Sequence, residues 1–439
     1  MNWEFQMTIR FVTVLMSGYL GVTAVAHAQV TFHKDVELIL QAHCQSCHRP
    51  GEIGPMPLLS YDDVRPWARA IKTAVTTRKM PPWFADSSVQ HYTNDASLSV
   101  AEIDKLASWV DAGAPRGDPN DSPRPRTFVE GWNIGQPDVV IEMPQAYEVP
   151  ARGTIEYTYV ILPTNFTKDT WVQAAEIRPG NRAVMHHAAL HVRPPGSPWL
   201  REFPAGVAFV PAANSSVNES RPSDEWLTNY APGRPTASLP AGTAFLVKAG
   251  SDFVLQFHYT PNGRPTSDRS KIGLVFAQSA PEHRAFIAPI ADRSFVIPPG
   301  DSNYRSTGSR TLATDAVLLA VGPHMHLRGK AMEVSVTYPT GTSELLLRVP
   351  KYDFNWQLLY EFGPARVAPR GTRLDVTGVW DNSAANRSNP DPKSPVRWGD
   401  QSWEEMLIGW VTMQVDPTVD VDAIFEKAPA RLPTDGLTR

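Results

Sequence analysis

The sequence has little of what marks several common classes of protein. Only two of its 439 residues are cysteines, so a framework of several disulfides is excluded. Charged residues make up 20 %, the net charge is −4 (41 basic against 45 acidic), and no block of one sign occurs. We therefore expect no nucleic-acid partner and no anionic-membrane partner. After residue 28 no apolar run approaches the roughly 20 residues of a membrane span, so we expect no span.

Proline, in contrast, is abundant. Its 41 residues are about 9 % of the chain, which is roughly twice the average usage. Because proline interrupts helices, long helices are excluded over most of the chain. The length predicts two to four domains, and a hydrophobic content of 42 % is enough to build their cores.

The first 28 residues have the form of an export signal. Arg10 precedes an apolar run at residues 11–25, and Ala26-His27-Ala28 forms a small-residue cleavage site. We expect the mature chain to begin near residue 29 and to be periplasmic or secreted.

One short motif in the exported part points to a specific cofactor. Cys44 and Cys47 are three residues apart and His48 follows, which gives Cys-x-x-Cys-His. This is the attachment motif of c-type haem: two thiols add to the haem vinyl groups and the imidazole ligates the iron. A zinc site would need two further ligands nearby, and a thioredoxin-like pair would need a strand–helix context that is missing. We therefore predict covalently bound haem c.

Short helical patterns surround this motif, and we expect residues 29–115 to form a small helical haem domain. The expected helices are residues 36–44, 61–78 and 99–112. Ser99 and Glu102 form a capping box at the start of the last helix. The region resembles class I cytochrome c domains.

The haem iron needs a sixth ligand. Met80 is our candidate because it stands in a stiff segment before two prolines, and Met/His ligation raises the haem potential. Met56, eight residues after His48, is the rival. A core role for Met80 is the other alternative.

Residues 116–134 are a linker by composition, and beyond them the pattern changes to short β-branched or alternating runs. The clearest runs are residues 139–143, 154–162, 171–177, 244–248, 254–259, 272–277, 332–338 and 374–380. They predict two antiparallel β-sandwiches, residues 135–282 and 283–429, followed by a tail at 430–439.

Five histidines in this β part fall into three tight contexts: His186-His187, His258 and His324-x-His326. Two histidines two positions apart share a face of a strand, so His324 and His326 can reach one ion. His186 and His187 are adjacent and would point to opposite faces, so joint ligation requires a bulge or a bend. Each histidine alone is more often an ordinary structural residue, but the set predicts metal sites. Nearby thioethers favour copper over zinc.

Four segments carry a resemblance to a known family. They are Val184-Met185-His186-His187-Ala188-Ala189-Leu190, Leu255-Gln256-Phe257-His258-Tyr259, Pro323-His324-Met325-His326-Leu327-Arg328-Gly329-Lys330 and Glu405-Met406. In this order they resemble the copper type II, ascorbate-dependent monooxygenases, which include peptidylglycine α-hydroxylating and dopamine β-monooxygenases.

The resemblance implies a fold and two copper sites. The implied fold class is a small all-α cytochrome c domain followed by two all-β antiparallel jelly-roll sandwiches, each with one copper ion. The implied ligands of the electron-transfer copper are His186, His187 and His258. The implied ligands of the oxygen-binding copper, and hence the catalytic residues, are His324, His326 and Met406.

The implied activity is hydroxylation of a C–H bond of a small molecule with O2, with electrons relayed by the haem from an external donor. Peptide-amidating relatives carry an arginine and a tyrosine where this chain has Gly322 and Trp410. We therefore expect an apolar or aromatic substrate, with Trp410 in its pocket. The alternative is a non-catalytic electron-transfer or copper-handling protein on the same scaffold.

Overall fold

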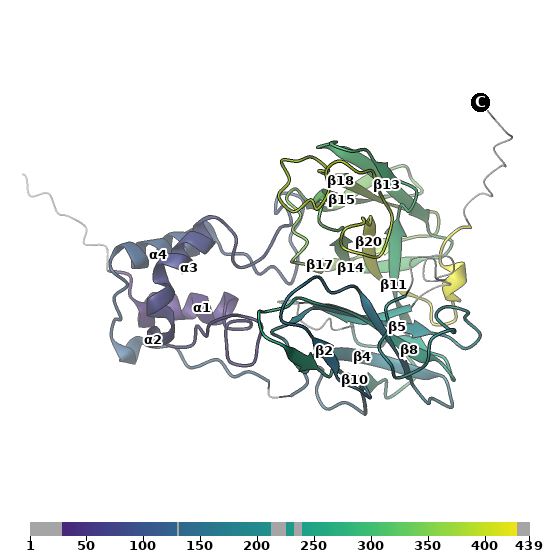
Figure 1. Cartoon of the computed structure of the whole chain (residues 1–439), viewed down its shortest axis with the longest axis horizontal. Coiled ribbons are helices and arrows are strands. Elements are labelled where there is room, and N and C mark those ends of the chain that lie inside the picture. The colour runs from purple at the N-terminus through teal and green to yellow at the C-terminus, as the bar shows by residue number, and fades with distance from the viewer. Residues whose placement is uncertain (1–28, 130, 212–224, 232–238, 428–439) are drawn as a thin grey trace, which may run out of the picture.

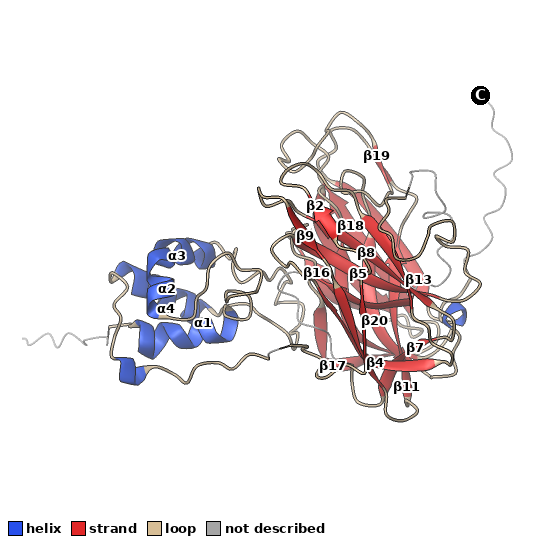
Figure 2. Ribbon diagram, turned by 60° about the horizontal axis from the view of Figure 1, so that its bottom comes forward, coloured by secondary structure: helices blue, strands red, loops and turns tan. Residues whose placement is uncertain are grey.

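 The computed structural model describes residues 29–129, 131–211, 225–231 and 239–427. The expected export signal (residues 1–28) and the whole expected tail (430–439) lie outside these ranges. Helices gather at one end of the molecule and strands form the rest (Figures 1 and 2). No helix in the described ranges is long and apolar enough to cross a membrane.

The helical segment consists of short elements. They are η1 (Phe32–Val36, a π-helix), α1 (Glu37–His43), α2 (Tyr61–Val64), η2 (Arg65–Trp67), α3 (Ala68–Thr76), α4 (Val100–Asp111) and η3 (Pro119–Asp121). The expected single helix at 61–78 is broken into three pieces, because Pro66 lacks an N–H and clashes with the preceding turn. The predicted capping box is confirmed: Ser99 accepts from the Glu102 backbone and Glu102 accepts from the Ser99 backbone.

The strands of the first β region are β1 (Val139–Glu142), β2 (Tyr147–Val149), β3 (Thr158–Pro163), β4 (Thr170–Arg178), β5 (Met185–Arg193), β6 (Glu225–Tyr230), β7 (Thr243–Val247), β8 (Asp252–Tyr259), β9 (Thr266–Asp268) and β10 (Lys271–Phe276). Those of the second are β11 (His283–Ala291), β12 (Val296–Ile297), β13 (Tyr304–Thr311), β14 (Ala316–His324), β15 (Gly329–Thr337), β16 (Ser343–Val349), β17 (Tyr360–Ala368), β18 (Arg373–Trp380), β19 (Val396–Arg397) and β20 (Ile408–Val415), with the 3-10 turn η5 (Val421–Ala423) after them. The eight strand runs expected from the sequence all coincide with strands, to within a few residues.

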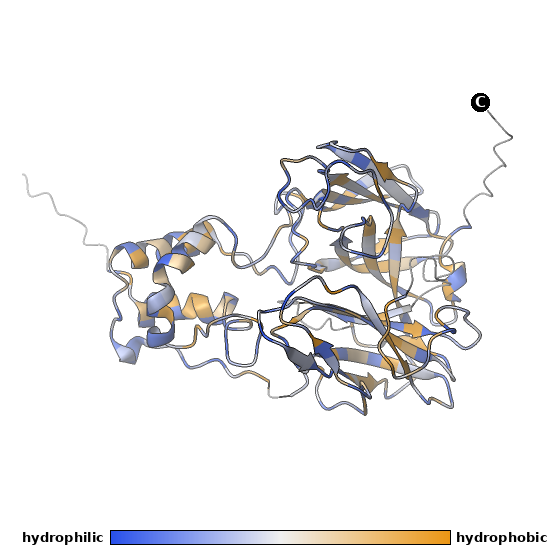
Figure 3. Ribbon diagram, in the orientation of Figure 1, coloured by the Kyte–Doolittle hydropathy of each residue, from blue (hydrophilic) through white to orange (hydrophobic). Residues whose placement is uncertain are grey.

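The fold is β-rich and sandwich-like, and its β part has two large hydrophobic cores. An eight-stranded sheet has the order β1-β10-β4-β7-β11-β20-β14-β17. The four-stranded sheet β3-β8-β5-β6 shares one core with the first half of that sheet, and β13-β18-β15-β16 shares the other core with the second half. Hydrophobic residues run along the strands of both regions (Figure 3).

The predicted fold class is wrong. The structure is mostly β-strands, its α-helices are short, with at most 12 residues in the described ranges, and an all-α cytochrome c domain is not shown. The β part is also not two separate antiparallel jelly rolls, because β7 and β11 pair in parallel and join both regions in one sheet. Hydrophobic alternation specifies which face of a strand is buried, but it does not specify which strand lies at its edge.

Two contacts connect the helical segment to the β regions. Between α3 and α4 the chain lies on the second region, where Tyr92 bridges to Phe362 and the Trp83 ring lies 4.8 Å from that of Tyr360. On the other side, Glu52 forms an ion pair with Arg182 of the first region. The segment that carries the Cys-x-x-Cys-His motif therefore touches both β regions.

Candidate metal centres

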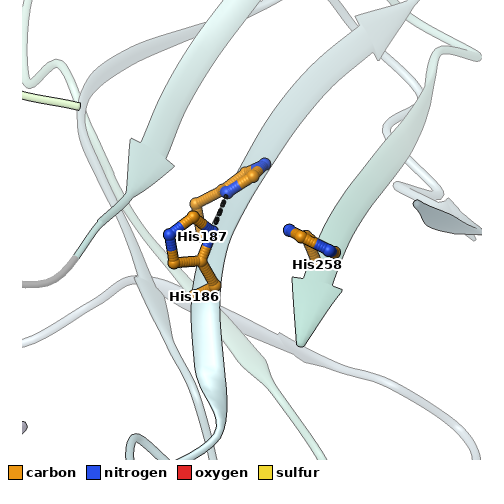
Figure 4. Close-up of side chains that lie close together, drawn as sticks. All are labelled: His186, His187 and His258. Carbon is orange, nitrogen blue, oxygen red and sulfur yellow. Dashed lines mark hydrogen bonds between the residues drawn. The ribbon is translucent and has the colours of Figure 1, made fainter. Parts of the chain in front are cut away.

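The first cluster consists of His186 and His187 on β5 and His258 on β8. Met185 pairs with Tyr259 and His187 pairs with His258, so the register shifts by one residue at His186. This is the bulge that joint ligation by adjacent histidines requires, because it turns both side chains toward β8. Figure 4 shows the three rings gathered at the ends of the two strands.

The geometry of the first cluster suits a metal ion. One ring nitrogen of each histidine lies within 4.8 Å of the others. The Nδ1 atoms of His186 and His187 are 3.0 Å apart. Nδ1 of His258 is buried without a hydrogen-bond partner among the described residues. A buried nitrogen without a partner is costly, and a metal ion would satisfy it.

Burial keeps these imidazoles in the neutral form that binds metals. It lowers the pKa of His186 and of His258 to about 4. It also lowers the pKa of His187 well below the ordinary value, and the neighbouring histidines of both β regions lower it further. Removing a cation from water disfavours the charged ring, so the three rings are deprotonated at neutral pH.

The second cluster begins with His324, at the end of β14, and His326, in the turn after it. Their ring centroids are 5.2 Å apart. Nδ1 of His324 lies 2.9 Å from Oε1 of Gln357, and Nδ1 of His326 lies 3.2 Å from the Glu404 carbonyl oxygen. If each Nδ1–H donates to that oxygen, the Nε2 atoms remain for a metal, an arrangement common around metal-bound histidines. Nε2 of His326 is buried with no partner in the described chain.

Met406 belongs to the same surroundings. His324 pairs with Ile408 in the antiparallel β14–β20 ladder, so extending that register sets Met406 opposite His326. The Met406 side chain is 6 % exposed and lines a cavity together with both histidines. The thioether and the two imidazoles thus come from two adjoining segments of the second region.

A buried carboxylate fixes the backbone between these ligands. Glu405 accepts hydrogen bonds from the backbone N–H groups of His326 (2.9 Å) and Arg328 (2.7 Å) and from Nε1 of Trp380 (3.0 Å). Burial raises its pKa to about 7 despite these donors. Glu405 therefore ties the turn after β14 to the segment that leads to β20.

The two clusters meet at one small cavity, with about 40 Å³ of room for water-sized molecules, lined by His187, His324, His326 and Met406 among others. The buried ring of Tyr157 stacks on His258 at 4.7 Å and lies 6.3 Å from His326. The Phe354 ring contacts His186 and His326 at 5.4 and 5.9 Å.

The sequence does not indicate that Tyr157 and Phe354 belong to the site. Neither has a metal-ligand pattern around it in the sequence. Only the approach of the two β regions makes them neighbours of both clusters, so no local signal in the sequence could have found them.

Trp410 also lines this cavity and stacks on Trp226 of β6 at 3.8 Å. Gly322 is its partner in the β14–β20 ladder. Gly322 and Trp410 are therefore directly opposite one another. Neither offers a charged group to a substrate carboxylate.

The predicted haem-binding residues lie at the end of α1. Cys44 and Cys47 are free thiols, and burial raises the pKa of Cys44 to about 12. Nδ1 of His48 lies 3.1 Å from the Met56 carbonyl oxygen, which leaves Nε2 for an iron ion. Gly54 packs so closely on this turn that a Cβ there would lie 2.7 Å from the Cys47 carbonyl oxygen. The motif therefore has a compact, fixed backbone with donor atoms of the right kinds.

The two candidates for the sixth ligand lie in different parts of the helical segment. Met56 packs against the helical core. Met80 is half-buried in the turn after α3, where its N–H donates to the Ala74 carbonyl oxygen. Ligation by Met80 stays a prediction.

Comparisons with known proteins do not identify a family for this chain. No protein-family model matches the sequence, and no curated protein matches it. Among solved structures, infectious bursal disease virus Gx strain matches with a TM-score of 0.20 and 9 % identity over 65 % of this chain and 74 % of that chain. The VP2 subviral particle of the same virus also gives 0.20 and 9 %, over 65 % and 73 %. TM-scores this low carry no argument about fold or function.

Proposed function

We propose that the chain is an exported, haem- and copper-dependent monooxygenase that hydroxylates a C–H bond of a small apolar or aromatic molecule. The observation that carries the proposal is the convergence of the two clusters on one cavity. Hydroxylation combines one C–H bond, O2, two electrons and two protons into an alcohol and water. Two one-electron sites beside one substrate position meet that requirement.

The donor sets fit copper. His186, His187 and His258 offer only imidazoles, whereas the second cluster offers two imidazoles and a thioether, a softer set that favours Cu(I). Copper bound there would supply one-electron transfer at the first cluster and O2 chemistry at the second.

The residues around the second cluster would orient its ligands and the substrate. Gln357 and the Glu404 carbonyl fix the imidazole planes of His324 and His326. Trp410 and Trp226 give the cavity an aromatic wall. An apolar substrate would bury its surface there without leaving a charge unpaired.

The haem would be attached through Cys44 and Cys47 and held by His48 and Met80, and it would supply one-electron transfer. An external donor, either a small reductant or a redox protein, would then deliver electrons one at a time. The ion pair between Glu52 and Arg182 supports this role, since it holds the loop after His48 against the region that carries the first cluster.

One observation favours the second candidate function, a non-catalytic electron-transfer or copper-handling protein. The room of about 40 Å³ in the cavity is enough for about one water molecule, and a hydroxylase needs space for its substrate. A carrier has no such need. A catalyst would have to open this cavity when the substrate binds.

The test is O2 consumption by the reduced, copper-loaded protein with a panel of small apolar and aromatic compounds, with products identified by mass spectrometry. The monooxygenase proposal expects one alcohol formed per O2 consumed, and loss of both when His324 is replaced by alanine. Full copper loading without substrate-dependent O2 consumption on any compound would favour the carrier.

A further inference from the structure

Two hydrogen-bond donors at the cavity between the clusters have no acceptor among the described residues. They are Nε2 of Gln357 and Nε1 of Trp226, and both atoms are buried. Both residues line the cavity together with His324, His326 and Met406. A buried donor without an acceptor lowers stability, because it has lost its hydrogen bonds to water. An acceptor atom of a ligand in the cavity would satisfy these donors.

The amide of Gln357 has a defined orientation. Its Oε1 lies 2.9 Å from Nδ1 of His324. If Nε2 of His324 binds a metal ion, Nδ1 carries the proton and donates it, so the atom of Gln357 beside it must be the oxygen. Nε2 of Gln357 therefore remains as a donor next to a candidate metal ligand.

The loop that carries Gln357, between β16 and β17, is tied to the turn that carries the second cluster. The hydroxyl of Tyr352 accepts a hydrogen bond from the Met325 N–H at 3.1 Å and donates one to the Met325 carbonyl oxygen at 2.9 Å. Met325 stands between His324 and His326. The position of the Gln357 donor is thus fixed relative to both imidazoles.

Trp226 brings the second donor from the first β region. Its ring stacks on that of Trp410, with centroids 3.8 Å apart and planes at 20°. The His191 ring lies 5.1 Å away with its plane at 84° to the indole. These two contacts restrict the indole plane, so its N–H belongs to a fixed aromatic wall.

Charge at the cavity disfavours an anionic ligand. No lysine or arginine is among the described residues that line it, and the carboxylate that does so belongs to Asp400. This carboxylate accepts a hydrogen bond from the Tyr159 hydroxyl at 3.2 Å. A ligand carboxylate would lie near Asp400 without a side-chain cation to compensate it. The lining therefore favours an uncharged ligand that carries an acceptor.

The size of the cavity agrees with this chemistry. Its room of about 40 Å³ is enough for an oxygen atom but not for a whole aromatic molecule. We expect the acceptor oxygen of the ligand to occupy this room. Its ring would have to displace part of the wall that Trp226 and Trp410 form.

We propose that the substrate is an uncharged aromatic molecule with an acceptor oxygen, such as a carbonyl, and that Gln357 and Trp226 bind this oxygen through Nε2 and Nε1. This rests on the proposed function and names its substrate class. An analogue without the oxygen would leave both donors unpaired in the complex, so the two residues determine specificity.

The experiment measures binding to the full, copper-loaded chain without a reductant, so that no turnover occurs. Equilibrium dialysis gives the affinities of acetophenone, of ethylbenzene, which lacks the oxygen, and of benzoate, which is an anion. Gln357→Glu keeps an oxygen for His324 but removes the donor, and Trp226→Phe keeps an aromatic ring but removes the N–H. Each should weaken acetophenone binding about three- to ten-fold and leave ethylbenzene binding and copper content unchanged. Benzoate should bind more weakly than acetophenone.

Two control variants make the same exchanges away from the cavity. Gln278→Glu and Trp67→Phe, both at exposed positions, should bind all three compounds as the wild type does. Wild-type acetophenone affinity in Gln357→Glu and Trp226→Phe, an equal loss of ethylbenzene binding, or tighter binding of benzoate would overturn the assignment and leave the proposed function intact. If the expected preferences are found but no compound triggers O2 consumption by the reduced protein, the proposed function fails while the binding assignment stands.

Discussion

The two clusters bring their candidate metal ligands together by different local structures. The first lies inside one sheet, where a register shift lets neighbours on β5 face β8. The second lies beyond the ends of β14 and β20 and depends on the buried Glu405 to hold a turn. The first cluster is supported by the backbone hydrogen bonds of the β5–β8 ladder, whereas the turn that carries the second depends on a few side chains. We therefore expect the first cluster to be the more rigid and the second to tolerate change less.

The largest effects should come from removing one imidazole from either cluster. We expect His187→Ala and His326→Ala each to bind one copper ion per chain in place of two, because each cluster has its own donors. His326→Ala should also abolish substrate-dependent O2 consumption. Elemental analysis and electron paramagnetic resonance of the copper-loaded variants check this. Loss of both ions from either variant would mean that the clusters form one shared site.

Glu405→Ala should destabilise the fold strongly. It leaves the backbone N–H groups of His326 and Arg328 and the Trp380 indole without their acceptor, a loss of about 3 kcal/mol or more for a buried network. Urea unfolding at neutral pH measures the change. As a control, Glu344→Ala removes a partly exposed carboxylate that accepts from Tyr338, and should cost less than about 1 kcal/mol. Equal costs for the two variants would contradict the role given to Glu405.

Met406→Leu separates ligation from packing. The change preserves volume and should cost less than about 1.5 kcal/mol of stability. If the thioether binds copper, the second ion should bind more weakly while the first cluster keeps its own. Copper titration followed by elemental analysis decides it. Two tightly bound ions and undiminished hydroxylation would mean that Met406 only packs the core and does not bind copper.

The smallest effect concerns the electron supply to the first cluster. Met80→Ala should open the sixth position of the haem and lower its potential, with little change in copper binding. Optical spectra and redox titration of the haem-loaded protein measure this. Met56→Ala is the matched comparison, and the same changes in that variant alone would move the ligand to Met56.

The sequence predicted well wherever a pattern is local. The strand runs, the capping box at Ser99 and the need for a bulge at His186-His187 depend on residues close together in the chain. The fold class was wrong because it depended on strand partners. Nothing in the alternation of β7 or β11 encodes their parallel pairing, which joins the two regions. The helix expected at 61–78 breaks at Pro66, although this proline stands in the sequence itself.

The sequence by itself determined which donor atoms this chain possesses and how they are spaced: two thiols and an imidazole in one motif, and five histidines and Met406 in ordered segments. Only the tertiary structure decided that the two clusters share a cavity and that Tyr157 lies between them. The physical reason is that side-chain chemistry and strand periodicity are set by neighbours in sequence, whereas these contacts join residues far apart in the chain, such as Tyr157 and His326. Such contacts form only where burial of apolar surface in the two cores outweighs the entropy of closing long loops.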